Sequence, residues 1–224
     1  MFAGHIGAAL AIGRAERRIN VGLFVVAALW LDVLLWLFVL AGWESVTIGA
    51  DFAATHQPSF VFPWSHGLLA SAGWAALAGV AAGTFHPGQG LGRWRTAALI
   101  AAAVFSHWLL DALVHVPELP LAGPGSPKLG LGWWQHMPVA LAAEALFVVA
   151  GLCLYLLGAG LSRARKLWLA TLCLVLLAFT VAGMTIAPAP PSAAAMAASS
   201  LVTVLLVGAA ACWIGAGPDM PQPR

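Results

Sequence analysis

Three ionisable residues recur at every fourth position in the segment SHWLLDALVH, residues 106–115 of an otherwise apolar stretch. Positions i, i+4 and i+8 of an α-helix differ by only about 40° each, so His107, Asp111 and His115 would share one stripe of a helix. Imidazole nitrogens and carboxylate oxygens are ligands of zinc and related divalent metals. The stripe therefore predicts a metal or catalytic site, with a buried hydrogen-bonded pair that fixes helix packing as the alternative.

Other polar residues interrupt apolar segments singly. Asp32 lies in ALWLDVLLW, where a carboxylate among Leu and Trp requires a cation or a proton, so it is interpreted as a metal ligand or as a protonated structural residue. His66, in PWSHGLL, is a candidate ligand or proton shuttle, with an interfacial capping residue as the alternative. His5 is a candidate ligand if the first apolar segment enters the membrane. The candidates for moving a proton are His115, His136 and Glu144.

The composition indicates whether this chain folds in water or in a lipid bilayer. Of its 224 residues, 62% are hydrophobic and only 8% are charged, against about 25% charged in soluble domains. So little charge cannot cover a water-facing surface, and the long apolar runs predict an integral membrane protein. No basic arm or patch is present, so we expect no nucleic-acid partner. The three cysteines lie inside apolar runs and form no zinc-knuckle spacing.

The apolar runs predict an all-α, polytopic helix bundle with about seven membrane helices in a single domain, residues 1–224. Six runs are long enough to span, because a spanning helix needs about 20 residues: 21–42, 64–84, 96–116, 137–160, 167–187 and 194–216. Residues 1–13 predict a short first membrane helix, with an amphipathic surface helix as the alternative. The motifs fall in residues 1–120, and helices 137–216 are expected to form a scaffold.

The basic residues predict the orientation of the bundle. They gather in alternate connections, at 14–18, 93–95 and 163–166, and only Lys128 lies on the opposite side. The positive-inside rule then puts the N-terminus outside and the C-terminus inside. We expect the membrane to be a bacterial inner membrane. On a rise of 1.5 Å per residue, His107 and Asp111 lie about 18 and 24 Å beyond Arg95, so the polar groups belong to the outer half of the bilayer.

The order of these motifs resembles the predicted membrane-bound, metal-dependent hydrolases related to the LexA-binding inner-membrane protein. The matching pieces, all within residues 3–120, are GHIGAAL, LWLD, AGWESVTI with Glu44, FPWSHGLL and FSHWLLD. The resemblance implies a hydrolase activity and a metal site formed by His5, Asp32, His66, His107 and Asp111. Asp32 is a single acid where some relatives have two, which argues against a two-metal site.

The leading hypothesis is a membrane hydrolase whose divalent metal activates water against an amphiphilic or periplasmic ester or phosphate. Zinc is the first candidate metal, with manganese or iron as alternatives. A metal-ion or proton transporter and a structural or regulatory membrane protein without a metal are the rival hypotheses. The inner half of the bilayer is nearly empty of ionisable groups, which favours a one-sided site over a transport path. The substrate and the oligomeric state stay open.

Overall fold

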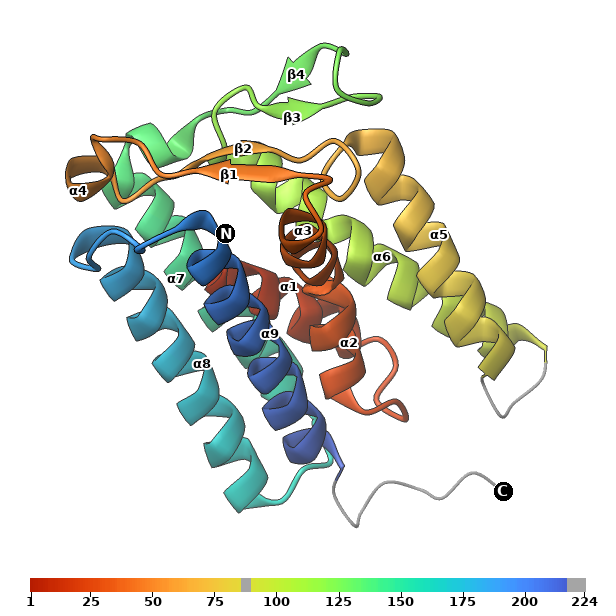
Figure 1. The fold of residues 1–224 in the computed structure, drawn as a ribbon. Coiled ribbons are helices and arrows are strands. Elements are labelled where there is room, and N and C mark those ends of the chain that lie inside the picture. Colours follow the sequence, from red (N-terminus) through yellow and green to blue (C-terminus); the bar gives the residue numbers. More distant parts are fainter. Residues whose placement is uncertain (86–89, 217–224) are drawn as a thin grey trace.

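A computed structural model describes residues 1–85 and 90–216 and has the predicted architecture, an all-helical membrane bundle (Figure 1). Residues 86–89, part of a predicted basic turn, lie outside the described residues. The main helices are α1 (Ala3–Gly13), α2 (Val21–Ala28), α3 (Trp30–Leu40), α5 (Leu68–Phe85), α6 (Leu91–Val114), α7 (Met137–Leu156), α8 (Arg163–Thr185) and α9 (Ala193–Gly215).

Five of the described helices, α5 to α9, are long and apolar enough to cross a membrane, and the bent pair α2 and α3 counts as a sixth only if the two helices form one span. The first helix agrees with the predicted short membrane helix and not with the surface-helix alternative, because most residues of α1 are buried. At about 1.5 Å per residue its 11 residues reach only about 16 Å, so α1 does not cross the bilayer alone. It is enclosed by α2, α6 and α7 instead.

The connections at one end of the bundle contain short strands and helices where the sequence suggested only loops. Strands β1 (Ser45–Thr47) and β2 (Ser59–Val61) form an antiparallel hairpin with α4 (Phe52–Thr55) between them. A second hairpin joins β3 (Leu119–Pro120) to β4 (Lys128–Leu129), and the 3-10 helix η1 (Trp133–Gln135) leads into α7. Both hairpins lie over the same end of the bundle (Figure 1).

The basic turns lie at the opposite end, as their alternation predicts. There Arg14 and Arg17 donate to the carbonyls at the end of α7, and Arg165 donates to Trp213 and Ile214 at the end of α9. These arginines satisfy carbonyls that helix ends leave without partners. The end with the hairpins and the end with the arginines therefore correspond to the two predicted sides of the membrane.

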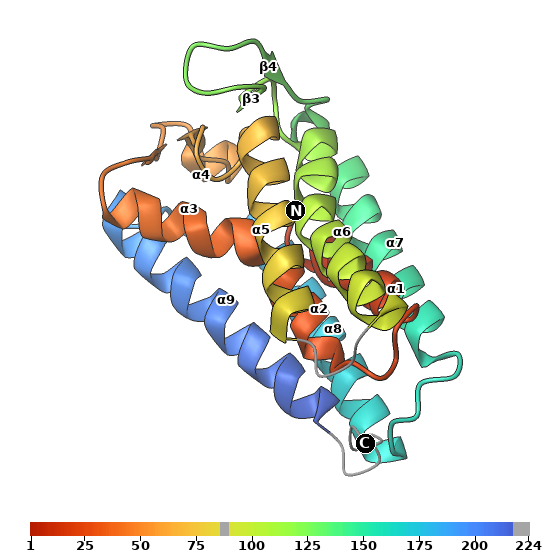
Figure 2. The ribbon, with the colours of Figure 1, turned by 90° about the vertical axis from the view of Figure 1, so that its right-hand side faces the viewer.

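The predicted single helix over 21–42 is wrong in one respect: it is broken at Leu29, and α2 and α3 meet at an angle of 44°. Leu29 has ψ near 4°, so the backbone leaves the α conformation there. Figure 2 shows α3 lying across the bundle after this bend. Asp32 stands in the first turn of α3, and the bend sets the position of its side chain.

Close glycine contacts hold the elements that carry the polar residues. Gly7 of α1 lies against the backbone of Phe147 and Gly151 in α7, and Gly22 of α2 lies against the backbone of Cys212 in α9. Small residues allow two membrane helices to approach this closely, which is how such helices gain van der Waals contact in lipid. The C-terminal helices therefore position the motif-bearing helices directly.

Candidate metal centre

The five residues of the predicted metal site meet in one place, although they come from four parts of the chain. His5 is on α1, Asp32 on α3 and His66 in the turn before α5, while α6 supplies His107 and Asp111. The three histidines and Asp111 are at most 2% exposed. Asp32 is the most open member, with 18% of its side chain exposed.

Asp111 lies at the centre of the group. Its Oδ1 is 3.1 Å from His5 Nε2, and its Oδ2 is 3.1 Å from His107 Nε2 and 3.5 Å from His66 Nε2. The amino group of Met1 donates to Oδ1 at 2.8 Å. Asp32 approaches the other side, with Oδ1 3.6 Å from His107 Nε2 and 3.9 Å from His66 Nε2. Every short distance involves a histidine Nε2 or a carboxylate oxygen.

These atoms form two overlapping sets, each with all its ligand atoms within 4.8 Å of one another. One set is His5, His107 and Asp111, and the other is Asp32, His66 and His107. Because both sets use His107, one ion between them could draw on all five side chains. Nitrogen and oxygen donors in this ratio suit zinc, and also manganese or iron.

The tautomer of His107 follows from its outer contact. His107 Nδ1 lies 2.6 Å from the carbonyl oxygen of Ala28. A carbonyl can only accept a hydrogen bond, so Nδ1 carries the proton and donates. The lone pair of the neutral ring is then on Nε2, which faces Asp111 and Asp32. The Ala28 carbonyl stands at the break between α2 and α3, so the bend is part of the site.

His66 is held in the same tautomer by a different route. Glu44 accepts hydrogen bonds from the backbone N–H groups of Trp64 and Ser65 and from the Ser65 hydroxyl, at 2.8, 2.8 and 2.6 Å. That hydroxyl has a single proton, which goes to Glu44, so Ser65 Oγ accepts from His66 Nδ1 at 2.8 Å. Burial raises the pKa of Glu44, and the hydrogen bonds from Ser65 and Trp64 oppose that rise.

Two imidazole lone pairs therefore face each other. His66 Nε2 and His107 Nε2 are 3.1 Å apart, and both Nδ1 protons are already donated elsewhere. Two lone pairs at this distance repel each other unless a proton or a metal ion lies between them. Two zinc–nitrogen bonds of about 2.05 Å at a tetrahedral angle separate their nitrogens by about 3.3 Å. The spacing of the two rings thus fits a shared metal ion.

His115 keeps its place on the predicted stripe although it is the residue that caps α6. Its N–H donates to the Asp111 carbonyl at 2.9 Å, and only its ψ of 146° leaves the helical range. Its ring faces the cluster, with Nε2 3.9 Å from Asp111 Oδ2. On its outer side Nδ1 is 2.6 Å from Glu118 Oε1. His115 and Glu118 thus form a carboxylate–histidine pair at the edge of the site.

Glu144 and His136, the other two predicted proton carriers, have different positions. Glu144 accepts from the backbone N–H groups of Phe2 and Gly4 at 2.9 and 2.6 Å, so it holds the start of α1 against α7. His136 is exposed at the start of α7. The structure does not bring His136 to the cluster. Its position two helical turns before Glu144 could not predict this, because the direction of its ring depends on the turn that precedes α7.

The groups that the sequence did not assign to the site are Ala28, Glu118 and the amino group of Met1. No sequence feature indicated a role for the Ala28 carbonyl, because no Pro or Gly marks the helix break at Leu29. Glu118 had a weak one, since it is an acid three residues after His115 in a polar loop.

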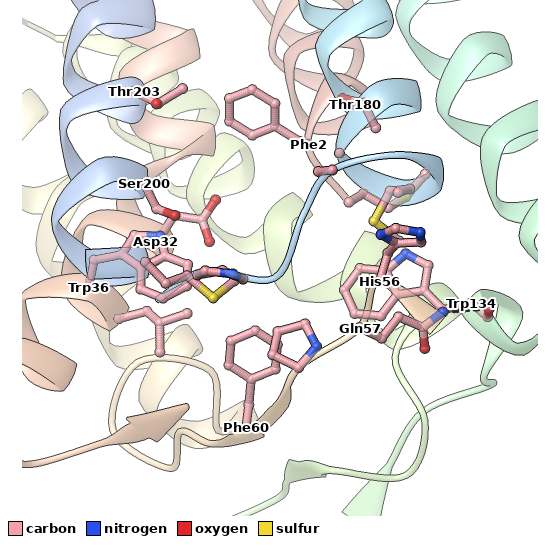
Figure 3. Close-up of a pocket in the computed structure, with 18 of the residues that line it drawn as sticks. Phe2, Asp32, Trp36, His56, Gln57, Phe60, Trp134, Thr180, Ser200 and Thr203 are labelled. Atoms are coloured by element: carbon pink, nitrogen blue, oxygen red, sulfur yellow. Dashed lines mark hydrogen bonds between the residues drawn. The ribbon is translucent and has the colours of Figure 1, made fainter. Parts of the chain in front are cut away.

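A cavity of about 550 Å³ opens beside the cluster. Asp32, His66, Asp111 and His115 form part of its wall, and most of the remainder is apolar. Figure 3 shows Asp32 and Trp36 on one side of this cavity, Phe2 and Thr180 deeper between the helices, and His56, Gln57 and Trp134 on the other side. The cluster is therefore buried from bulk water yet accessible to a molecule in the cavity.

Comparisons of this chain with protein-family models, with curated proteins and with solved structures find no match.

Proposed function

We propose that this chain is a membrane-embedded, metal-dependent hydrolase with a single divalent ion held by His5, Asp32, His66, His107 and Asp111. The observation that carries the proposal is the 3.1 Å approach of the His66 and His107 Nε2 atoms, whose outer nitrogens are both committed as donors. A cation between the rings removes the repulsion of their lone pairs. Zinc is the first candidate ion, because its usual ligands are histidine and carboxylate.

The surroundings of the cluster support a metal site over a packing contact. Ligating histidines typically donate their second N–H to a carboxylate or a backbone carbonyl, which fixes the ring and its tautomer. His107 uses the Ala28 carbonyl, and His66 uses Glu44 through Ser65. Purely structural interhelical hydrogen bonds need one contact per ring and would not require both rings to aim Nε2 at the same point.

The cavity supports a hydrolase over a transporter. The site opens on the hairpin side, and the next buried residues of α6 toward the arginine end are apolar, namely Val104, Ala103 and Ile100. Within the described part of α6, Thr96 is the one buried polar residue beyond them. A transport path requires polar groups through both halves of the membrane.

A bound divalent ion supplies the Lewis acidity that makes water nucleophilic near neutral pH. The chain's own groups would exclude bulk water and move protons. Asp32, the most open ligand, faces the cavity where substrate and water meet. In hydrolysis the water oxygen gives up a proton and bonds to the acyl carbon or phosphorus, the bond to the leaving alcohol breaks, and that alcohol takes up a proton. We assign this proton transfer to His115, paired with Glu118 at the rim of the cluster.

The same proposal includes a location. The separation of arginines and hairpins to opposite ends fits insertion in a bacterial inner membrane, with the arginine end in the cytoplasm and the metal site toward the outside. A reporter enzyme fused near residue 160, between α7 and α8, should therefore report a cytoplasmic location.

Metal analysis of the detergent-purified full chain tests the proposal. Wild type should contain about one zinc, manganese or iron per chain, and Asp111→Ala and Asp32→Ala should lose it. Asp51→Ala removes an exposed carboxylate from the same end of the bundle and is the matched control, which should retain the ion. Well-folded wild type that binds no metal after titration with each ion would refute the metal site and with it the hydrolase.

A further inference from the structure

The cavity continues away from the cluster between two membrane-spanning helices. Its lining includes residues of α8 from Phe179 to Met184 and residues of α9 from Met196 to Val204. Helix α9 packs mainly on α2 and α3, and α8 packs more on α7 than on α9. Two of the lining side chains, Phe179 and Ser199, are exposed, so the cavity reaches the surface between the two helices.

This opening faces hydrocarbon, because both helices are apolar over membrane-spanning lengths. From Met196 to Val204 the crevice runs about 12 Å along α9, close to the roughly 15 Å of hydrocarbon in one leaflet. The volume of about 550 Å³ is within the range of small-molecule sites, about 300–1,000 Å³.

Three of the four hydroxyl groups along the crevice are bonded to their own helices. Thr180 donates to the Leu176 carbonyl, Thr203 to that of Ser199, and Ser199 to that of Met196. The fourth, Ser200, stands on the same side of the cavity as Asp32 (Figure 3). The remaining α8 and α9 residues of this wall are Phe179, Gly183, Met184, Met196 and Val204, so the wall is mostly apolar and suits a hydrocarbon chain.

The opposite end of the cavity is polar. Its wall includes Asp32 of the cluster on one side and His56 and Gln57 on the other side (Figure 3). His56 Nδ1 is buried and has no hydrogen-bond partner among the described residues. His56 also adopts a left-handed conformation, φ 52°, which is unusual for a residue other than glycine and holds its ring beside the cavity. No Lys or Arg is found among the described residues that line the cavity.

We infer that the substrate is a membrane amphiphile with one hydrocarbon chain in the crevice between α8 and α9 and its ester or phosphoester group at the metal centre. This inference rests on the proposed hydrolase and names its substrate class. The substrate enters laterally from the lipid bilayer, and its hydrocarbon chain, held in the crevice, positions the ester beside Asp32 and His115. Without a lining Lys or Arg, the metal ion is the positive group that attracts the ester oxygen, and His56 donates to the head group.

Photo-crosslinking in nanodiscs tests the inference with a defined probe, a lysophosphatidylglycerol that carries a diazirine in the middle of its acyl chain. In the full-length wild type, the label should concentrate on the α8 and α9 peptides that line the crevice. Gly183→Trp should reduce that labelling at least about fivefold, because a Cβ on Gly183 meets no atom within 4 Å and the indole can fill the crevice. Thr203→Trp provides a second obstruction from α9.

Two matched controls separate obstruction from general damage. Gly73→Trp alters a helical glycine of α5 whose Cβ would also meet no atom within 4 Å and which does not line this cavity. Val202→Trp adds the same indole next to Thr203, on a side chain that is 55% exposed and does not line the cavity. Both controls should be labelled like wild type. Equal labelling of all lipid-facing helices, unchanged by the two obstructing variants, would overturn the inference.

The metal content of the same samples distinguishes the two proposals. Gly183→Trp and Thr203→Trp should keep the ion while they lose the label, since neither residue is a ligand. Crevice labelling in a wild-type chain that binds no metal would contradict the proposed hydrolase, whereas metal with uniform labelling would contradict the substrate class alone.

Discussion

Helices α6 and α8 are nearly equal in length, 24 and 23 residues, and both pass as membrane spans, yet their contents differ. Half of the residues in an apolar 18-residue stretch of α6 are buried in the protein, against 22% in the corresponding stretch of α8. The ionisable residues of α8 all lie in its first turn, whereas α6 has His107 and Asp111 far inside. Ionisable groups at membrane depth are thus found where other helices enclose them, because lipid cannot solvate them.

The largest effect in this comparison is expected for Asp111→Asn in α6 set against Thr180→Val in α8. Both changes preserve side-chain shape at a buried polar position. Asp111→Asn should abolish metal binding, with a loss larger than the roughly 10–100-fold typical of outer-sphere changes, because it removes the central anionic ligand. Thr180→Val should leave metal content unchanged. Metal analysis decides, and an Asp111→Asn chain that retained its ion would favour the packing interpretation.

The next largest effect is expected on metal affinity, when the two serines that directly precede metal ligands are replaced. Ser65 and Ser106 come directly before His66 and His107, but only the Ser65 hydroxyl contacts the ring of its neighbour, and Ser106 donates to the Ala103 carbonyl. Ser65→Ala should weaken metal affinity about 10–100-fold, because the His66 tautomer loses its support. Ser106→Ala should be close to wild type. Competition titration with a chelating dye measures both, and equal affinities would remove Ser65 and Glu44 from the site.

An effect of similar size, on stability instead of metal affinity, is expected for glycine substitutions in an enclosed helix, α1, and in a lipid-facing helix, α8. A Cβ on Gly7 would collide with the carbonyl of Phe147, whereas a Cβ on Gly183 would meet open space. Gly7→Ala should destabilise the bundle by about 1–3 kcal/mol, the usual range for overpacking. Gly183→Ala should be neutral or stabilising by less than about 1 kcal/mol. Thermal unfolding in detergent tests this, and identical midpoints would show that α1 and α7 can separate without cost.

The smallest effect belongs to His136→Ala. Because His136 is exposed and makes no contact with the cluster, its removal should change stability by less than about 0.5 kcal/mol and leave the metal content intact. The variant to compare with it is His115→Ala, which should keep the ion but change its surroundings. Replacing the metal with cobalt makes this change measurable as a shift in the cobalt absorption spectrum. A loss of metal in His136→Ala would mean that this residue reaches the cluster.

Much of the fold follows from local patterns. Apolar runs between charged turns locate α5 to α9 to within a few residues, because the bilayer sets a minimum span and lipid tolerates little charge. The same reasoning selects His5, Asp32, His66, His107 and Asp111, since an ionisable group in such a run requires partners. The break at Leu29 escaped prediction, because no Pro or Gly marks it, whereas Pro117 marks the end of α6 to within a few residues.

The sequence by itself determined that this chain folds in lipid as a helical bundle and that a few His and Asp residues must seek one another there. Hydropathy and charge act over short stretches, so they can be read without knowing the fold. Only the tertiary structure decided which nitrogen of each histidine faces the centre, since the Ala28 carbonyl and the Ser65–Glu44 pair come from distant segments. It also decided that the cavity opens between α8 and α9, because that gap depends on how each helix packs against its other neighbours.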